Sequence, residues 1–151
     1  MQILQFRGES WLSRVIQAQT RSPYSHSALL TADYHLIEAW HGVGVTATPL
    51  EDHPHSGGTW VDVFDVRADY DESAVLDFAL RQVGKRYDYR AVLRFLSRRD
   101  APDNDKWFCS ELVAAAFAAG GLDLLHGRHS HFSPRDIALS PYLHKTQEIL
   151  L

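Results

Sequence analysis

The stretch DKWFCSELVAAAF, residues 105–117, contains the only cysteine of a 151-residue chain, at the point where polar residues give way to apolar ones. The apolar residues after Ser110 recur as on a packed helix, and Gly120 and Gly121 provide a stop. The spacing therefore predicts a helix that begins near Cys109. The first turn of a helix favours a thiolate, because its unpaired N–H groups and its dipole face the sulfur. Cys109 is a candidate nucleophile, although a lone cysteine is more often a small core residue.

A nucleophilic cysteine also needs a base, and two strand-like runs upstream supply a candidate. The runs are SHSALL at residues 25–30 and YHLIEAW at residues 34–40, joined by TAD. If TAD is a three-residue hairpin loop, His26 lies opposite Glu38, and opposed residues have Cβ atoms about 4.5–5.5 Å apart. A two-residue loop would instead place His26 opposite Ala39.

His26 and Glu38 suit the two roles that such a cysteine requires. Apolar residues flank Glu38 on its strand, where a carboxylate is costly unless something pairs with it. A carboxylate beside an imidazole fixes the ring tautomer and stabilises the imidazolium, which leaves the other ring nitrogen free to take a proton from a thiol. We therefore expect His26 to be the base for Cys109 and Glu38 to orient His26. A histidine taken alone is more often a satisfied core or surface residue.

The remaining periodicity predicts helices flanking an antiparallel sheet, which is an α+β arrangement. Further strands are predicted at 2–6, 44–50 and 59–66, further helices at 11–20, 71–84 and 88–99, and a short helix or strand near 142–151. Residues 51–58 and 126–136 are polar and rich in turn-forming residues, so they are predicted to be loops. No linker divides the chain, and residues 1–151 are expected to form one domain.

Composition and charge exclude several classes of protein. A hydrophobic content of 45% and a charged content of 23% are typical of a globular chain with a core. The formal charge of −4 offers no basic surface for nucleic acid. No apolar run is long enough for a transmembrane helix, no signal peptide is visible, and a single cysteine cannot form an internal disulfide. We therefore expect a cytoplasmic protein.

Nine histidines raise the question of a metal site. Two short segments are rich in them, and these hold His53, His55, His126, His129 and His131. Neither segment has the i, i+4 helical spacing of an HExxH zinc site, so solvated loop histidines are the expected interpretation. His35 and His41 have the opposite strand parity to His26 and are expected on the other sheet face. We predict no metal and no other cofactor.

Four motifs follow one another along the first 120 residues. They are RGESWLSRVIQAQTRSPYSHSALL (7–30), HLIEA (35–39), GKRYDY (84–89) and WFCSELVAAAF (107–117). As an ordered set they resemble the permuted NlpC/P60 papain-like cysteine hydrolases, often called YiiX-like. In that group the histidine strand precedes the cysteine helix, the reverse of ordinary papain-like enzymes, and this is the order here. The resemblance implies a small antiparallel sheet or barrel packed against helices, with a Cys–His–polar triad.

By position in these motifs, the resemblance implies that Cys109 is the nucleophile, His26 the general base and Glu38 the third member. It also implies that Tyr87 in GKRYDY helps to hold the oxyanion, together with the backbone N–H of Cys109. Tyr24 in YSHSALL is a further candidate for oxyanion or substrate binding. For both tyrosines, packing at the edge of a core is the alternative.

The implied activity is hydrolysis of peptide or amide bonds of the bacterial cell-wall type through a thioester acyl-enzyme. Relatives also act on acyl groups, so ester or thioester hydrolysis or acyl transfer is the second possibility. The third is a catalytically silent module that binds a peptide or lipid, against which the complete Cys–His–Glu set argues. Because no export signal is visible, a cell-wall substrate would require delivery by a phage particle or a secretion apparatus.

Overall fold

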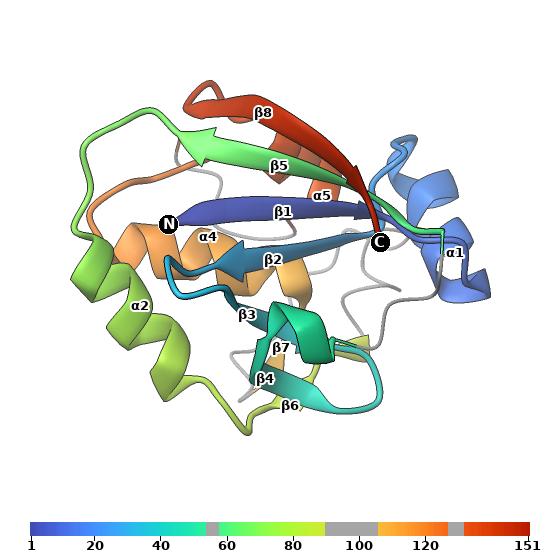
Figure 1. The fold of residues 1–151 in the computed structure, drawn as a ribbon, viewed down its shortest axis with the longest axis horizontal. Helices are drawn as coiled ribbons and strands as arrows, with labels where there is room; N and C mark the ends of the chain where they lie inside the picture. The colour runs from blue at the N-terminus through green and yellow to red at the C-terminus, as the bar shows by residue number, and fades with distance from the viewer. Residues whose placement is uncertain (54–57, 90–105, 127–131) are drawn as a thin grey trace.

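A six-stranded antiparallel sheet forms the centre of the computed structural model, which describes residues 1–53, 58–89, 106–126 and 132–151 (Figure 1). The strand order across the sheet is β4-β3-β2-β1-β5-β8. These strands are β1 (Gln2–Arg7), β2 (His26–Leu30), β3 (His35–Trp40), β4 (Gly44–Pro49), β5 (Trp60–Val66) and β8 (Leu143–Leu150). A separate parallel pair is formed by β6 (Arg86–Tyr87) and β7 (Lys106–Trp107).

Helices accompany the sheet, so the predicted α+β class is confirmed. The helices are α1 (Trp11–Thr20), α2 (Glu72–Arg81), α4 (Cys109–Ala119) and α5 (Pro134–Ala138), with a 3-10 turn η1 (Leu50–Asp52). Side-chain caps fix where the first two begin: Ser10 accepts from Ser13 N at 3.1 Å, and Asp71 accepts from Ala74 N at 3.0 Å. In Figure 1, α4 lies behind the middle of the sheet and α1 lies beyond one end of it.

Apolar side chains cover both faces of the sheet, as alternation along strands requires. On one face the sheet packs against α2, α4 and α5, through Ile3, Leu29, Ile37 and Phe64. The other face carries a second cluster, formed by Leu4, Phe6, Ala28, Leu30, Leu36, Val61 and Val63. Leu50 of η1 and Ile149 of β8 also pack on this second cluster, although they come from opposite edges of the sheet. The sheet must therefore curve around the second cluster.

The hairpin of β2 and β3 has a different register from the predicted one. The prediction placed Leu30 opposite Tyr34, whereas Leu30 lies opposite Leu36, two residues further along. Tyr34 instead belongs to the turn, where its backbone has a φ of 59°. A shift of two residues preserves side-chain parity, so His26 and Glu38 stay on the same face as diagonal neighbours.

Two segments near the end of the chain can be compared with their predictions. The loop predicted at 126–136 ends earlier than expected, because residues 134–138 form α5. Ser133 caps this helix by accepting from Asp136 N, and Pro134 suits the first helical position. The segment near 142–151 is a strand, β8. The helix predicted at 88–99 lies almost entirely outside the described residues. In the part of the chain that is described, no helix has both the length and the apolarity to cross a membrane.

Candidate active site

Cys109 is the first residue of α4, as the sequence predicts. Its thiol therefore lies in the first turn, where backbone N–H groups have no helical acceptor and the helix dipole favours an anion. Glu111 accepts from Phe108 N at 3.4 Å and so helps to fix the entry into this turn. Cys109 has no exposed surface, and it packs in a cluster with Ile16, Ala39, Val45, Tyr87, Phe108 and Leu112.

His26 joins this thiol to the carboxylate of Glu38. Nε2 of His26 lies 2.5 Å from Oε2 of Glu38, and Cys109 is near enough to His26 to shift the pKa of its imidazole. Because Glu38 occupies Nε2, Nδ1 is the ring nitrogen that remains for the thiol. Burial alone would lower the pKa of His26, but the charge and hydrogen bond of Cys109, together with those of Glu38, raise it to about 10. The structure thus brings the three predicted residues together, with His26 hydrogen-bonded to Glu38 and close enough to Cys109 for their charges to interact.

Glu38 is buried, and both of its carboxylate oxygens have an imidazole beside them. Its side chain is 1% exposed, and while Oε2 faces His26, Oε1 lies 2.5 Å from Nε2 of His53. Burial raises the pKa of Glu38, but the hydrogen bonds from His26 and His53 outweigh it and lower the pKa to about 2. Glu38 is therefore a carboxylate at neutral pH, with an imidazole Nε2 at ion-pair distance from each of its oxygens.

His53 is the member of this group that sequence reasoning missed. It was expected to be a solvated loop histidine, whereas its side chain is only 2% exposed. The turn η1 follows β4 and packs on the curved face of the sheet through Leu50, which places His53 beside Glu38. Polar loop composition does not reveal where a loop packs. The one signal in the sequence was Glu38 itself, since a buried carboxylate has two oxygens to satisfy.

Two aromatic rings, Phe6 and Trp40, surround the imidazoles. Trp40 meets both edge-on, with ring centroids 5.1 Å from His26 at 89° and 4.7 Å from His53 at 86°. Phe6 lies 5.3 Å from His26 and 6.0 Å from His53. Such surroundings exclude water and strengthen the hydrogen bonds to Glu38.

Tyr87 lies beside Cys109 because of the parallel pair β6 and β7, which the sequence analysis did not predict. Tyr87 pairs with Trp107, two residues before Cys109, and Asp88 N donates to Trp107 O at 2.9 Å. Burial, followed by the negative charge of Cys109, raises the pKa of Tyr87 above its ordinary value. Its hydroxyl therefore keeps its proton and can act as a donor.

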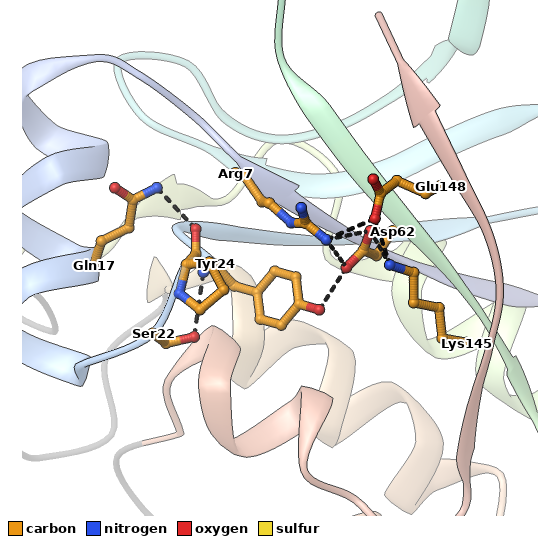
Figure 2. Close-up of polar contacts among 8 residues, drawn as sticks. Arg7, Gln17, Ser22, Tyr24, Asp62, Lys145 and Glu148 are labelled. Atoms are coloured by element: carbon orange, nitrogen blue, oxygen red, sulfur yellow. Dashed lines mark hydrogen bonds and ion pairs between the residues drawn. The ribbon is translucent and has the colours of Figure 1, made fainter.

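Tyr24 lies outside the group formed by Cys109, His26 and Glu38. Its hydroxyl donates to Oδ2 of Asp62 at 2.6 Å, and Figure 2 shows the ring pointing toward Asp62 between Arg7 and Lys145. Burial and the hydrogen bond to Asp62 raise the pKa of Tyr24 to about 12. Tyr24 is thus held in an ionic cluster on β1, β5 and β8, and no described contact joins it to Cys109 or the other site residues.

A cavity of about 240 Å³ opens beside His26. One wall comes from α1 and the loop before it, and the opposite wall from the sheet and η1. The lining residues are Phe6, Gly8, Glu9, Ser10, Leu12, Ser13, Ile16, Ser25, His26, Trp40, His41, His53, Thr59 and Tyr87. Cys109 is not among them, and its thiol is buried next to this cavity's Ile16 and Tyr87.

Two of the other described histidines, His41 and His35, lie at the two ends of β3. His41 was expected on the opposite sheet face, but it lines the cavity, because it follows the end of β3 and strand alternation no longer applies. His35 is at the start of β3, with Nδ1 3.2 Å from Asp33 O. His55, His129 and His131 lie outside the described residues. Among those that are described, no three or more His, Cys, Asp or Glu side chains form a group that could hold a metal ion.

Comparisons with known proteins identify a family and a fold. Residues 4–128 match the model of a family described as permuted papain-like amidase enzyme, YaeF/YiiX, C92 family. The structure resembles the crystal structure described as metalloprotein yiiX from Escherichia coli O157:H7, with a TM-score of 0.74 and 19% identity over 99% of this chain and 97% of that one. At this identity the likeness concerns the fold. No curated protein matches the chain.

Proposed function

The chain belongs to the permuted papain-like amidases of the C92 family, a branch related to but distinct from NlpC/P60, and on this basis we propose that it is a cysteine hydrolase of amide bonds. The observation that carries the proposal is the placement of His26 between Glu38, to which it is hydrogen-bonded, and Cys109 at the first turn of a helix, beside a cavity. Residues 1–151 are proposed to act as one domain.

The thiolate of Cys109 is the nucleophile in this proposal. His26 accepts the thiol proton at Nδ1, and the resulting imidazolium is stabilised by Glu38 at Nε2. The sulfur attacks the carbonyl carbon, forms a C–S bond and moves the carbonyl electrons onto oxygen. When the tetrahedral intermediate collapses, the C–N bond breaks and His26 returns its proton to the amine. A water molecule, deprotonated by neutral His26, then hydrolyses the thioester and frees the acid and the thiol.

Two donors are placed to stabilise the oxyanion. The backbone N–H of Cys109 belongs to the first turn of α4 and has no helical acceptor. Tyr87 packs in the same cluster as Cys109, and the raised pKa of its hydroxyl keeps it a donor. The contact between Tyr24 and Asp62 supports a structural role for Tyr24 rather than the substrate-binding role first considered.

The cavity bears on the substrate. Its α1 wall combines the hydroxyls of Ser10 and Ser13 with the apolar side chains of Leu12 and Ile16. The hydroxyls suit a peptide or amide of the cell-wall type, which we propose as the substrate. The apolar side chains suit a fatty acyl group, so ester or thioester hydrolysis is the second candidate.

Incubation with muropeptides and, separately, with acyl esters and thioesters tests the proposal. We expect amide cleavage by the wild-type chain, detected by mass spectrometry, and no cleavage by Cys109→Ala. A short-lived mass increase on the protein, equal to the acyl part of the substrate, should accompany turnover. Cleavage of esters or thioesters without cleavage of amides would show that the chain is an acyl hydrolase and not an amidase. If neither panel gave a product or a covalent adduct, the chain would be a binding module and the enzyme proposal would be wrong.

A further inference from the structure

We propose that His53 is a positioning residue of this site, a fourth member that holds Glu38 in the orientation that His26 requires. The inference rests on the proposed function, because it concerns the same nucleophile. Neither the predicted triad nor the family description includes a second imidazole on the third member.

The argument begins with the carboxylate of Glu38. An ionised carboxylate has two oxygens, and in a site that is 1% exposed neither can rely on water. His26 occupies only Oε2, and the other oxygen lies 2.5 Å from Nε2 of His53. If the His53 donor were lost, Oε1 would be left buried without its partner. A buried acceptor in that state favours either protonation of the carboxyl group or rotation toward another donor, and both would release His26.

The position of His53 supports a positioning role over a catalytic one. Its Nε2 contacts Glu38 and not the thiol, so it acts on Cys109 through two intervening groups. It is held edge-on by Trp40, which also holds His26 at nearly the same angle. The two imidazoles are thus fixed on opposite oxygens of one carboxylate by one indole. This arrangement determines the direction in which Oε2 points.

Other titratable groups near the carboxylate differ from His53 in how they are placed. They lie around Glu38, His26 and the cavity. They are His26 on β2, His41 after the end of β3, Tyr87 on β6, Cys109 on α4 and Glu9 in the loop before α1. Of these, only His26 has a described hydrogen bond to Glu38. Burial lowers the pKa of His41, and the charge of His26 lowers it further. His41 therefore loses its proton at a lower pH than an ordinary histidine, and no described hydrogen bond joins it to Glu38.

Three variants test the proposal by the pH dependence of thiol alkylation with iodoacetamide. His53→Leu removes the donor. His53→Gln keeps an N–H donor near the position of Nε2. His35→Gln is a matched control, because His35 is a histidine of β3 whose described ring contacts are with Asp33. For His53→Leu we expect the pH of half-maximal alkylation to rise by about one unit, since Glu38 then stabilises the His26 imidazolium less. The alkylation rates of His53→Gln and His35→Gln should stay within about twofold of the wild-type rate at every pH. His53→Gln retains a donor to Glu38, and His35 has no part in the proposed site.

The outcomes separate this inference from the proposed function. If His53→Leu alkylates with the wild-type pH midpoint, or if His53→Gln shifts as much as His53→Leu, the positioning role is wrong while the nucleophile stands. If the shift appears but no substrate is cleaved, only the amidase proposal fails. A second measurement needs no variant. Long-range ¹⁵N–¹H NMR of the wild-type chain should show His53 protonated at Nε2 at pH 7, and a bare Nε2 would overturn the inference even if His53→Leu failed to fold or the wild-type thiol proved unreactive.

Discussion

At the scale of single residues, the chemistry depends on how each polar group is paired. Cys109, His26 and Glu38 could be predicted from sequence because each is conspicuous in its own segment: a lone thiol at a helix start, a strand histidine and an acid among apolar neighbours. His53 could not, because nothing local distinguishes it from the other histidines of polar loops. Tyr24 could not be assigned either, since its partner Asp62 lies 38 positions away.

The pairing of His26 predicts an unusual pH dependence of thiol reactivity. Because the pKa of His26 is raised to about 10, its imidazolium remains beside Cys109 across the neutral range. We expect iodoacetamide to modify wild-type Cys109 rapidly and at nearly the same rate at pH 6 and pH 8. In His26→Ala the rate at pH 6 should fall about tenfold or more and then rise with pH as for an ordinary thiol. Equal, slow alkylation of both chains would show that the thiol is merely a core residue.

The paired Glu38 predicts a pH-dependent contribution to stability. Its pKa is about 2 in the folded chain against an ordinary 4.5, so its contribution is complete above about pH 4.5 and disappears as the pH falls through about 2. At pH 7, Glu38→Gln should lower the free energy of unfolding by about 2–4 kcal/mol, because a buried ionic contact is broken. Urea unfolding of both chains should show this difference shrinking between pH 4.5 and pH 2. A difference that stays constant over that range would mean that the cost is steric.

At the scale of elements, the fold class followed from periodicity, whereas the register of β2 and β3 did not. Turn composition allowed several loop lengths, and the even shift from the predicted register preserved the face shared by His26 and Glu38. The parallel pair of β6 and β7 could not be predicted, because two-residue strands have no periodicity to read. Yet this pair brings Tyr87 to the site.

Gly44 determines how closely the segment carrying Tyr87 can approach β4. Val45 N donates to Lys85 O at 2.8 Å, and a Cβ on Gly44 would lie 2.3 Å from that same oxygen, on a backbone with a φ of 110°. We expect Gly44→Ala to displace residues 85–87 and to reduce the turnover number by about tenfold, since misplacing a donor by about 1 Å is costly. The matched control is Gly84→Ala, which has a φ of 88° but open space around the added Cβ. If both variants lost activity equally, backbone strain alone would explain the loss.

Gly120 likewise allows a close approach, here between the end of α4 and the start of α2. A Cβ there would lie 2.5 Å from Val75 Cγ2 and 2.8 Å from Asp71 O, while Asp71 N donates to Gly120 O at 2.8 Å. Gly120→Ala should therefore lower the free energy of unfolding by about 1–3 kcal/mol through overpacking. Ala118→Ser, on an exposed position of the same helix, should change it by less than about 0.5 kcal/mol. Thermal unfolding of both variants checks this, and an unaffected Gly120→Ala would show that the two helices can separate freely.

At the scale of the whole molecule, the ionic cluster around Asp62 joins strands from both ends of the chain. Arg7 of β1 lies 2.6 Å and Lys145 of β8 2.9 Å from this carboxylate, which is inaccessible to solvent (Figure 2). Asp62→Asn should lower the free energy of unfolding by about 2 kcal/mol, because it leaves Arg7 and Lys145 without their shared counter-charge. Glu148→Gln removes an exposed partner of the same two cations and should have little effect. Chemical denaturation that ranked the two variants in the opposite order would contradict this interpretation.

The distance in sequence between His26 and Cys109 has a consequence for the chain as it is made. The two residues are 83 positions apart (109 minus 26), and they meet only when α4 docks on a sheet formed largely from the first half of the chain. During synthesis Cys109 therefore emerges well after His26 and Glu38, and until α4 docks it lacks the imidazole that would activate its thiol. Under the proposed mechanism, full nucleophilicity arises only when folding brings the thiol, the imidazole and the carboxylate together, so a misfolded copy would carry an unactivated thiol.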